Sequence, residues 1–231
     1  MIFSGHSVLI FQNQFFNYLI TIIWVVGLMN SINMLDNMDG ISCIVSILAC
    51  FFMIAVNVSL FKTTSYATTL NLGVLGAPCG FLVFNFHPSK MFMGDTGSQF
   101  LGLFLAVMGI DNCWNNPTSP SMNGFPIANM VIVLLVFLLP ITDTISVVVN
   151  RLKEGRSPFV GGKDHTTHHL FFKGLTEKRI ALLFFGLGCT GIIMAYWLVI
   201  RFSYALFFIS ISYILFVFIS LYLVTVLKKK S

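Results

Sequence analysis

Long runs of uncharged, apolar residues constrain this chain more than any other feature of its sequence. A helix needs about 20 mostly apolar residues to cross the hydrocarbon of a bilayer, and only helices or closed barrels satisfy their backbone groups there. The runs are continuous and do not alternate with polar residues, so they predict helices. We therefore expect an all-α fold, a polytopic transmembrane helical bundle with about seven spans. The spans are expected near residues 14–34, 40–60, 66–86, 97–111, 126–148, 178–200 and 203–227.

The composition agrees with this prediction and excludes a soluble domain. Only 9% of the residues are charged and the mean hydropathy is +0.90, whereas about a quarter of the residues in a soluble domain are charged. The formal net charge of +5 is explained by Lys and Arg gathered at one membrane face, so no nucleic-acid partner is expected. The fourth expected span is short, with Asp111 at its end, and a re-entrant helix is the alternative there.

The distribution of basic residues predicts the orientation. With seven spans, one face receives eleven of the thirteen Lys and Arg residues and the other face receives Lys62 and Arg201. The first face is therefore expected to be cytoplasmic. If the fourth span only dipped into the membrane, the reversed orientation would count equally well, but Asp95 and the histidines near residue 168 would then lie on opposite sides. We expect a single integral-membrane domain over residues 1–231, in the inner (cytoplasmic) membrane with its active face in the cytoplasm, and a basic, histidine-bearing cytoplasmic loop at 150–176.

The first polar cluster follows the first expected span. Asn30, Asn33 and Asn37 are spaced to share one face of a helix, and Asp36 and Asp39 lie beside them. Acids at a membrane boundary are costly unless they face water or a ligand, and no basic residue is close in sequence. A cation or a polar substrate is the expected partner. The alternative is a solvated helix end capped by Asp and Asn.

The second cluster interrupts the apolar sequence between residues 84 and 98. It contains His87 and Pro88, and it places Asp95 in a Gly-Asp-Thr-Gly-Ser turn. Flanking glycines let the backbone approach a ligand, and a carboxylate beside small hydroxyls suits a hard cation such as Mg²⁺. Taken alone, such a turn is more often an ordinary loop, and His87 before a proline is structural by itself.

The third cluster lies in the loop after the fifth span, where Lys163 precedes His165, His168 and His169. In a helix these histidines would share a face. The chain has no HExxH pattern and no cysteine nearby, so phosphate binding or proton transfer is favoured over zinc. The alternative is a polar juxtamembrane loop attracted to anionic lipid. Asp143, in the fifth span, is either a functional acid or an interfacial acid hydrogen-bonded to its neighbouring threonines.

Taken together, the three clusters resemble the polyprenyl-phosphate N-acetylhexosamine-1-phosphate transferases. This family includes the undecaprenyl-phosphate GlcNAc-1-phosphate transferases and the phospho-MurNAc-pentapeptide translocases. The matching patterns are Asn30-x-x-Asn33-x-x-Asp36-x-x-Asp39-Gly40, Phe84-Asn-Phe-His87-Pro88 with Phe92-Met-Gly94-Asp95-Thr-Gly-Ser98, and His165-x-x-His168-His169. The histidine pattern is more similar to the GlcNAc-1-phosphate branch. The resemblance extends from about residue 21 to residue 175.

The resemblance implies transfer of N-acetylhexosamine-1-phosphate, in the first instance GlcNAc-1-phosphate, from a UDP-sugar to undecaprenyl phosphate, with release of UMP at the start of a cell-envelope glycan. The implied partners are a UDP-N-acetylhexosamine, the polyprenyl phosphate and membrane lipid, and a homodimer is left open. The implied cofactor is Mg²⁺, with Mn²⁺ as an alternative. By analogy, the metal ligands are Asp95 and Asn33; the catalytic residues are Asp36, Asp39, His165, His168 and His169; and the substrate-binding residues are Asn30, Asn33, Lys163, Asn85 and His87.

One departure from the family bears on activity. Family members carry an adjacent aspartate pair in an earlier cytoplasmic loop, after additional N-terminal spans, and this sequence contains no Asp-Asp. The chain is therefore expected to correspond to the C-terminal part of such an enzyme and to be weakly active or inactive alone. The alternatives are an inactive truncated fragment or membrane scaffold, and a transporter. A transporter would have acids near mid-span and paired half-repeats, whereas the acids here cluster at one expected face.

Overall fold

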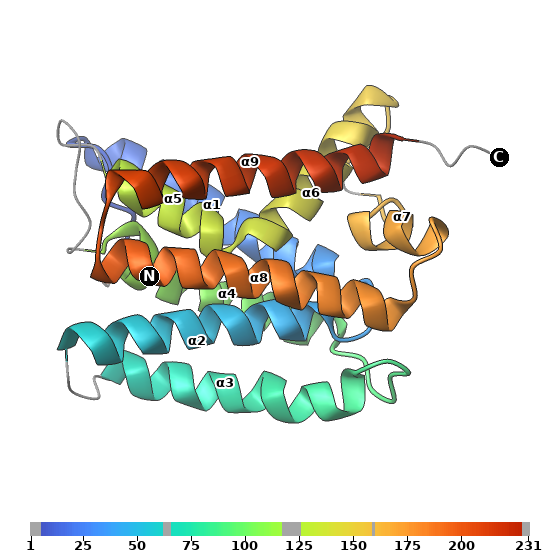
Figure 1. Ribbon diagram of the computed structural model, residues 1–231, viewed down its shortest axis with the longest axis horizontal. Coiled ribbons are helices and arrows are strands. Elements are labelled where there is room, and N and C mark those ends of the chain that lie inside the picture. Colours follow the sequence, from blue (N-terminus) through green and yellow to red (C-terminus); the bar gives the residue numbers. More distant parts are fainter. Residues whose placement is uncertain (1–5, 62–65, 117–125, 159, 228–231) are drawn as a thin grey trace.

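The computed structural model describes residues 6–61, 66–116, 126–158 and 160–227, and all regular structure in these ranges is helical (Figure 1). This confirms the all-α prediction. The α-helices are α1 (Gln14–Leu35), α2 (Ile41–Phe61), α3 (Tyr66–Asn85), α4 (Gly94–Gly109), α5 (Ile127–Val136), α6 (Leu138–Lys153), α7 (Thr166–Phe172), α8 (Glu177–Ile200) and α9 (Tyr204–Val226), and α4 continues into a π-helix, η2 (Ile110–Trp114). Of the basic residues counted above, Lys62 and Lys228–Lys230 lie outside the described ranges.

The chain is a multi-pass membrane protein. Five helices, α1, α2, α3, α8 and α9, are long and apolar enough to cross a bilayer, and α5 with α6 makes a sixth if the two count as one span. These numbers differ from the expected seven because α4 has only 16 residues and the fifth expected span is broken.

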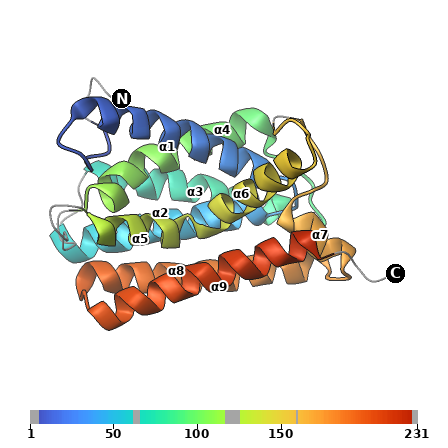
Figure 2. The same cartoon turned by 90° about the horizontal axis from the view of Figure 1, so that it is seen from above.

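The span expected at 126–148 is broken in the structure. The structure has two helices there, α5 and α6, which meet at Phe137 with a bend of 82°. The cause is Pro140, whose ring would clash with the carbonyl of Val136 in a continuous helix and whose nitrogen cannot donate to it. Proline is tolerated in the first turn of α6, so a new helix begins before it. Figure 2 shows α6 leaving α5 at an angle toward α7.

Helix α4 lies antiparallel along α1, and the two are joined in the middle and at both ends. In the middle, the indole of Trp24 donates a hydrogen bond of 2.9 Å to the carbonyl of Ala106. At one end, Asn33 contacts Asp95. At the other end, the side chain of Asn115, just beyond η2, donates to the carbonyl of Ser7 at 2.8 Å. The fourth expected span therefore follows α1 throughout and does not turn back.

The close contact between α1 and α4 depends on a glycine. A Cβ atom added at Gly102 would lie 2.7 Å from the Cα atom of Met29, which is inside van der Waals contact. Any larger residue at this position would push the two backbones apart.

The polar segments between the helices gather at one end of the bundle. Residues 36–40, 86–93 and 154–176 connect helices there, and Figure 1 shows α7 at the same end as the connection from α3 to α4. We call this the polar end. Asp111 lies at the opposite end, where its carboxylate is 3.0 Å from Nδ1 of His6.

Candidate functional site

The first part of the site is the turn between α1 and α2. Helix α1 ends at Leu35, and the backbone N–H of Asp36 caps it by donating to carbonyls of the last turn. Asn37 and Asp39 therefore lie in the turn, and the prediction that Asn37 shares a helical face with Asn30 and Asn33 is wrong. Gly40, at φ +76°, adopts the left-handed conformation that carries the chain from the turn into α2.

The pair Asn33 and Asp95 joins this turn to the start of α4. The Asn33 amide nitrogen donates 3.0 Å to Oδ1 of Asp95 and 2.8 Å to the hydroxyl of Ser98. Asp95 is exposed in the first turn of α4, just after Gly94 at φ +67°. The amide of Asn30 donates instead to the carbonyl of Val26 in its own helix.

The pKa of Asp36 reflects repulsion between the carboxylates of the polar end. Burial raises the pKa of Asp36, and the negative charges of Asp95 and Asp39 raise it further, against the hydrogen bond that it accepts from Ser42 at 2.5 Å. A divalent cation bound near Asp95 and Asp36 would relieve this repulsion, and carboxylate oxygens are the ligands that Mg²⁺ prefers. Asp95 is the most exposed of the three carboxylates; Asn33 presents its amide nitrogen to Asp95 and would have to offer its oxygen to an ion.

Three segments meet around the ring of His87. Its Nδ1 atom lies 3.0 Å from Oδ2 of Asp39 and 2.9 Å from Oε2 of Glu177, which begins α8. The backbone N–H of Ser89 donates to the same Asp39 oxygen at 3.0 Å. Sequence reasoning did not single out Glu177. The available signal was an acid at a membrane boundary, as at Asp39, but the neighbouring Lys178 and Arg179 offered Glu177 partners that Asp39 lacks in the sequence.

Asn85 ties two of these segments together. Its side-chain oxygen accepts the N–H of Gly40 at 3.0 Å, and its nitrogen donates to the carbonyl of Met91 at 2.8 Å. Asn85 is buried, and both ends of its amide bind backbone groups. The arrangement holds the α1–α2 turn against the α3–α4 connection.

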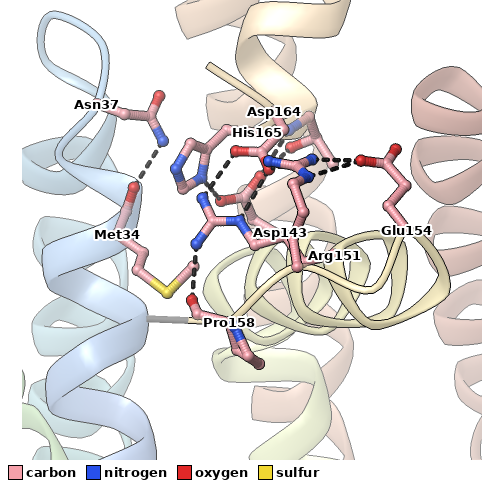
Figure 3. A network of polar contacts seen from close by, with 10 residues as sticks. Met34, Asn37, Asp143, Arg151, Glu154, Pro158, Asp164 and His165 are labelled. Carbon is pink, nitrogen blue, oxygen red and sulfur yellow. Dashed lines mark hydrogen bonds and ion pairs between the residues drawn. The ribbon is translucent and has the colours of Figure 1, made fainter. Parts of the chain in front are cut away.

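Asp143 holds in place the segment that carries Lys163 and the three histidines, residues 163–169, which we call the histidine segment. The carboxylate of Asp143 is 1% exposed, and its Oδ2 lies 2.8 Å from Nδ1 of His165, the residue before α7 (Figure 3). Its Oδ1 accepts from the N–H and the hydroxyl of Thr166 at 2.7 and 2.6 Å. The interpretation in which Asp143 bonds its neighbours in sequence, Thr142 and Thr144, is wrong; its partners are on the histidine segment.

A second anchor fixes the chain between α6 and α7. Arg151 donates two hydrogen bonds to Asp164, at 2.8 and 2.7 Å, and a third of 2.7 Å to the carbonyl of Pro158 (Figure 3). These hydrogen bonds and the charge of Arg151 lower the pKa of Asp164 to about 2, against the effect of its burial. Pro158 and Asp164 are thus both bound to Arg151, which lies in the last turn of α6.

The three predicted histidines have different positions. His165 precedes α7 and is buried against Asp143, whereas His168 and His169 lie within α7. Burial lowers the pKa of both His168 and His169, and the charges of His165 and Lys173, respectively, add to the effect. Both are therefore neutral at pH 7.

Two cavities open at the polar end. The larger, of about 300 Å³, is lined by Asn37, Met38, Asp39, Lys163, His168, Phe171, Phe172 and Glu177. The smaller, of about 80 Å³, is lined by Asp36, Asn37, Met38, Asp39, Asn85 and Phe92. Asp39 lies in the wall of both. The acidic turn and the histidine segment, which are more than a hundred residues apart in sequence, therefore face the same space.

Fold and site together define a multi-pass helical membrane protein with an acid- and histidine-bearing site at one end of its bundle. Residues 2–112 match the family described as glycosyl transferase family 4. The matched residues include Asn33, Asp36, Asp39, His87 and Asp95, and the match confirms the resemblance inferred from the motifs.

Individual relatives carry related names. The chain is 29% identical to the Bacillus subtilis protein named "Probable undecaprenyl-phosphate N-acetylglucosaminyl 1-phosphate transferase", over 77% of this chain and 47% of the relative. It is 29% identical to the decaprenyl-phosphate N-acetylglucosaminephosphotransferase of Mycobacterium leprae, over 75% and 46%. It is 31% identical to the phospho-N-acetylmuramoyl-pentapeptide-transferase of Levilactobacillus brevis, over 78% and 50%. The chain spans about half the length of the curated relatives it matches.

Proposed function

We propose that this chain carries the donor and cation site of an enzyme that transfers N-acetylhexosamine-1-phosphate from a UDP-sugar to a polyprenyl phosphate in the membrane. The observation that supports the proposal best is the larger cavity at the polar end. An acid from the α1–α2 turn, Asp39, and two nitrogen groups from the histidine segment, Lys163 and His168, line it together. A diphosphate donor bound with a cation needs both kinds of group. The names of the relatives favour GlcNAc as the sugar.

The reaction joins two anions. A phosphate oxygen of the polyprenyl phosphate attacks the phosphorus that carries the sugar, a new diphosphate bond forms, and the old bond to the bridging oxygen breaks so that UMP leaves with the electron pair. Catalysis of such a transfer consists mainly of positioning and of offsetting negative charge. When bound at Asp95, with Asn33 and Asp36 beside it, Mg²⁺ would supply that positive charge.

The residues of this chain have separate tasks in the proposal. Lys163, an exposed side chain on the cavity wall, offsets phosphate charge. His168 is neutral at pH 7 because burial lowers its pKa, so it acts as a hydrogen-bond partner of a phosphate or as a proton acceptor. Asp143 and the Arg151–Asp164 pair hold the segment that carries both.

The acceptor reaches the site from the membrane. An apolar cavity of about 310 Å³ lies between α1 and α6, with Gly27, Leu28 and Ile145 among its lining residues. Both helices end at the polar end, so an isoprenoid chain lying in this cavity is directed toward Asn33 and its neighbours. Membrane lipid fills the remaining apolar surface. A homodimer remains compatible with the proposal.

The proposal places the polar end in the cytoplasm, at the inner membrane. Among the described residues, that end carries Lys90, Arg151, Lys153, Arg156, Lys163, Lys173, Lys178 and Arg179, whereas the opposite end carries Arg201. The positive-inside rule and the supply of UDP-sugars both favour this orientation. A transporter is not favoured, because the described residues at the break between α5 and α6, Phe137 and Leu138, are buried and apolar.

Binding of the donor tests the proposal independently of turnover. Calorimetry of the purified chain in lipid nanodiscs would measure the affinity for UDP-GlcNAc with Mg²⁺, with Mn²⁺ and with EDTA. We expect cation-dependent binding that is lost in Asp95→Asn and retained in Asp111→Asn, which alters an acid at the opposite end. Binding that is equally strong with EDTA, or that Asp95→Asn leaves unchanged, would contradict the proposed site.

A further inference from the structure

We propose that Asp39, His87 and Glu177 form a second cation site, which takes zinc or a similar first-row divalent ion and is separate from the Asp95 site. The three side chains come from the α1–α2 turn, the α3–α4 connection and the first turn of α8. The inference does not depend on the proposed transfer, since it concerns binding of a metal ion alone.

The distances between the side-chain atoms fit one ion. Nδ1 of His87 lies 3.0 Å from Oδ2 of Asp39 and 2.9 Å from Oε2 of Glu177, and the three ligand atoms lie within 4.8 Å of one another. Ligand atoms bonded to zinc at about 2.1 Å are about 3.4 Å apart in its usual tetrahedral geometry. The side chains therefore need little movement to bind an ion between them.

The charges at this place also favour a cation. One Nδ1 hydrogen makes a linear hydrogen bond to one of the two carboxylates and leaves the other without it. Within the described part of the chain, neither Asp39 nor Glu177 has a lysine or arginine nitrogen within 4.0 Å. A divalent ion would neutralise both acids at once, which a single imidazolium does not.

The donor set distinguishes this site from the one at Asp95. Asp95, Asn33 and Asp36 offer oxygen atoms, which Mg²⁺ prefers, whereas an imidazole nitrogen with two carboxylates is typical of zinc and similar transition metals. The surrounding structure also orients the ligands, because the N–H of Ser89 donates to Asp39 at 3.0 Å.

The site has an open side. Asp39 and Glu177 line the larger cavity, together with Lys163 and His168. Three protein ligands leave at least one coordination position of a zinc ion free. An ion held here would therefore present that position to an anionic ligand in the cavity, and it would fasten the start of α8 to the α1–α2 turn.

Zinc titration of the chain tests the inference. The chain is prepared without a histidine tag, stripped with EDTA and titrated calorimetrically with Zn²⁺, with no nucleotide or polyprenyl phosphate present. We expect one equivalent to bind, with an affinity that falls at least about tenfold in Glu177→Gln and in His87→Gln. The control Glu154→Gln, at an exposed acid paired with Arg156 at the same end, should bind as the unaltered chain does.

Two results would overturn the inference. Failure of the unaltered chain to bind zinc would mean that a proton alone holds His87 between the two acids. Equal affinity of Glu177→Gln and the unaltered chain would mean that zinc binds elsewhere. If the variants do not fold, crystals of the unaltered chain soaked in zinc decide the question by anomalous diffraction, with a peak between the three side chains expected and a peak elsewhere contradicting the proposal. None of these results depends on whether the chain binds UDP-GlcNAc, so the zinc site and the proposed function are tested separately.

Discussion

Nδ1 of His165 lies 2.8 Å from Oδ2 of Asp143, and this contact joins the histidine segment to a helix that begins inside the bundle. The acid is 1% exposed and the histidine 8%. An acid buried to this degree is stabilised only when its partners are in place. The position of α7 therefore depends on Asp143 as much as on the sequence of α7 itself.

Replacement of Asp143 by Asn should destabilise the protein. The amide keeps an acceptor for Thr166 but presents a donor or a neutral oxygen to His165, so one charge-assisted contact is lost. We expect a loss of about 1–3 kcal/mol in the free energy of unfolding, measured by chemical unfolding in detergent micelles. Asp111→Asn, at an exposed acid paired with His6, is the matched control and should change stability by less. An unchanged value for Asp143→Asn would contradict the anchoring role.

The Arg151–Asp164 pair predicts a dependence of stability on pH. The pKa of Asp164 is lowered from 3.8 to about 2 by its hydrogen bonds from Arg151. A carboxylate with a lowered pKa stabilises the folded state above its unfolded pKa, and this contribution is lost as the pH falls toward the folded value. Unfolding curves of the chain and of Asp164→Asn should therefore differ most above pH 4 and converge between about pH 4 and pH 2. Curves that stay parallel over that range would contradict the assignment.

Asp36 is expected to lower stability at neutral pH. Its pKa is raised by burial and by the nearby charges of Asp95 and Asp39, so ionisation costs free energy in the folded state. This cost is absent below the pKa that Asp36 has in the unfolded chain, and it appears as the pH rises above that value. Asp36→Asn should therefore unfold at a higher temperature than the unaltered chain at pH 7 and bind Mg²⁺ more weakly. A lower unfolding temperature at pH 7 would show that the Asp36 charge is stabilised by a partner of opposite sign.

Replacement of a glycine by alanine should change stability differently at Gly102, which lies in the α1–α4 contact, and at Gly76, which does not. In Gly102→Ala the new methyl group would lie 2.7 Å from the Cα atom of Met29, so we expect a loss of about 1–3 kcal/mol and a weaker contact between Asn33 and Asp95. In Gly76→Ala, within α3, the methyl group meets nothing within 4 Å. That control should be neutral or stabilising by up to about 1 kcal/mol, because alanine favours a helix. Thermal unfolding of both variants measures the difference, and equal losses would contradict the close packing at Gly102.

The sequence was sufficient for the fold class and for the gathering of the polar segments. Apolar runs of bilayer length predict helices with little ambiguity, and the order of the runs brings every second connection to the same end. Hydropathy alone does not reveal the break between α5 and α6, because Pro140 lies within a continuous apolar run. The first span, predicted at 14–34, agrees with α1, but Asn37 was placed on the helical face wrongly because the spacing of the asparagines continues past the point where the helix stops.

The sequence predicted which residues belong to the site better than it predicted which of them contact one another. Asn33 and Asp95, predicted as metal ligands, are in contact in the structure, and Asp39 and His168 line one cavity. Glu177 was missed, and one of the two interpretations of Asp143 gave it the wrong partners. Contacts of this kind join residues more than 20 positions apart in sequence, and spacing along one helix carries no information about them. The roles assigned to the individual residues remain predictions.

Formation of the lipid-linked sugar is the most direct test of the proposed function. The chain is placed in nanodiscs that contain undecaprenyl phosphate and is mixed, in molar excess, with labelled UDP-GlcNAc and Mg²⁺. The label in the lipid extract and the released UMP are then measured. Because the chain is in excess over the donor, even one slow turnover is detected. The proposal predicts lipid-linked GlcNAc-phosphate and an equal amount of UMP, both absent in Asp95→Asn and present in Asp111→Asn. Lipid product that forms equally in Asp95→Asn, or UMP release without any lipid product, would contradict the account.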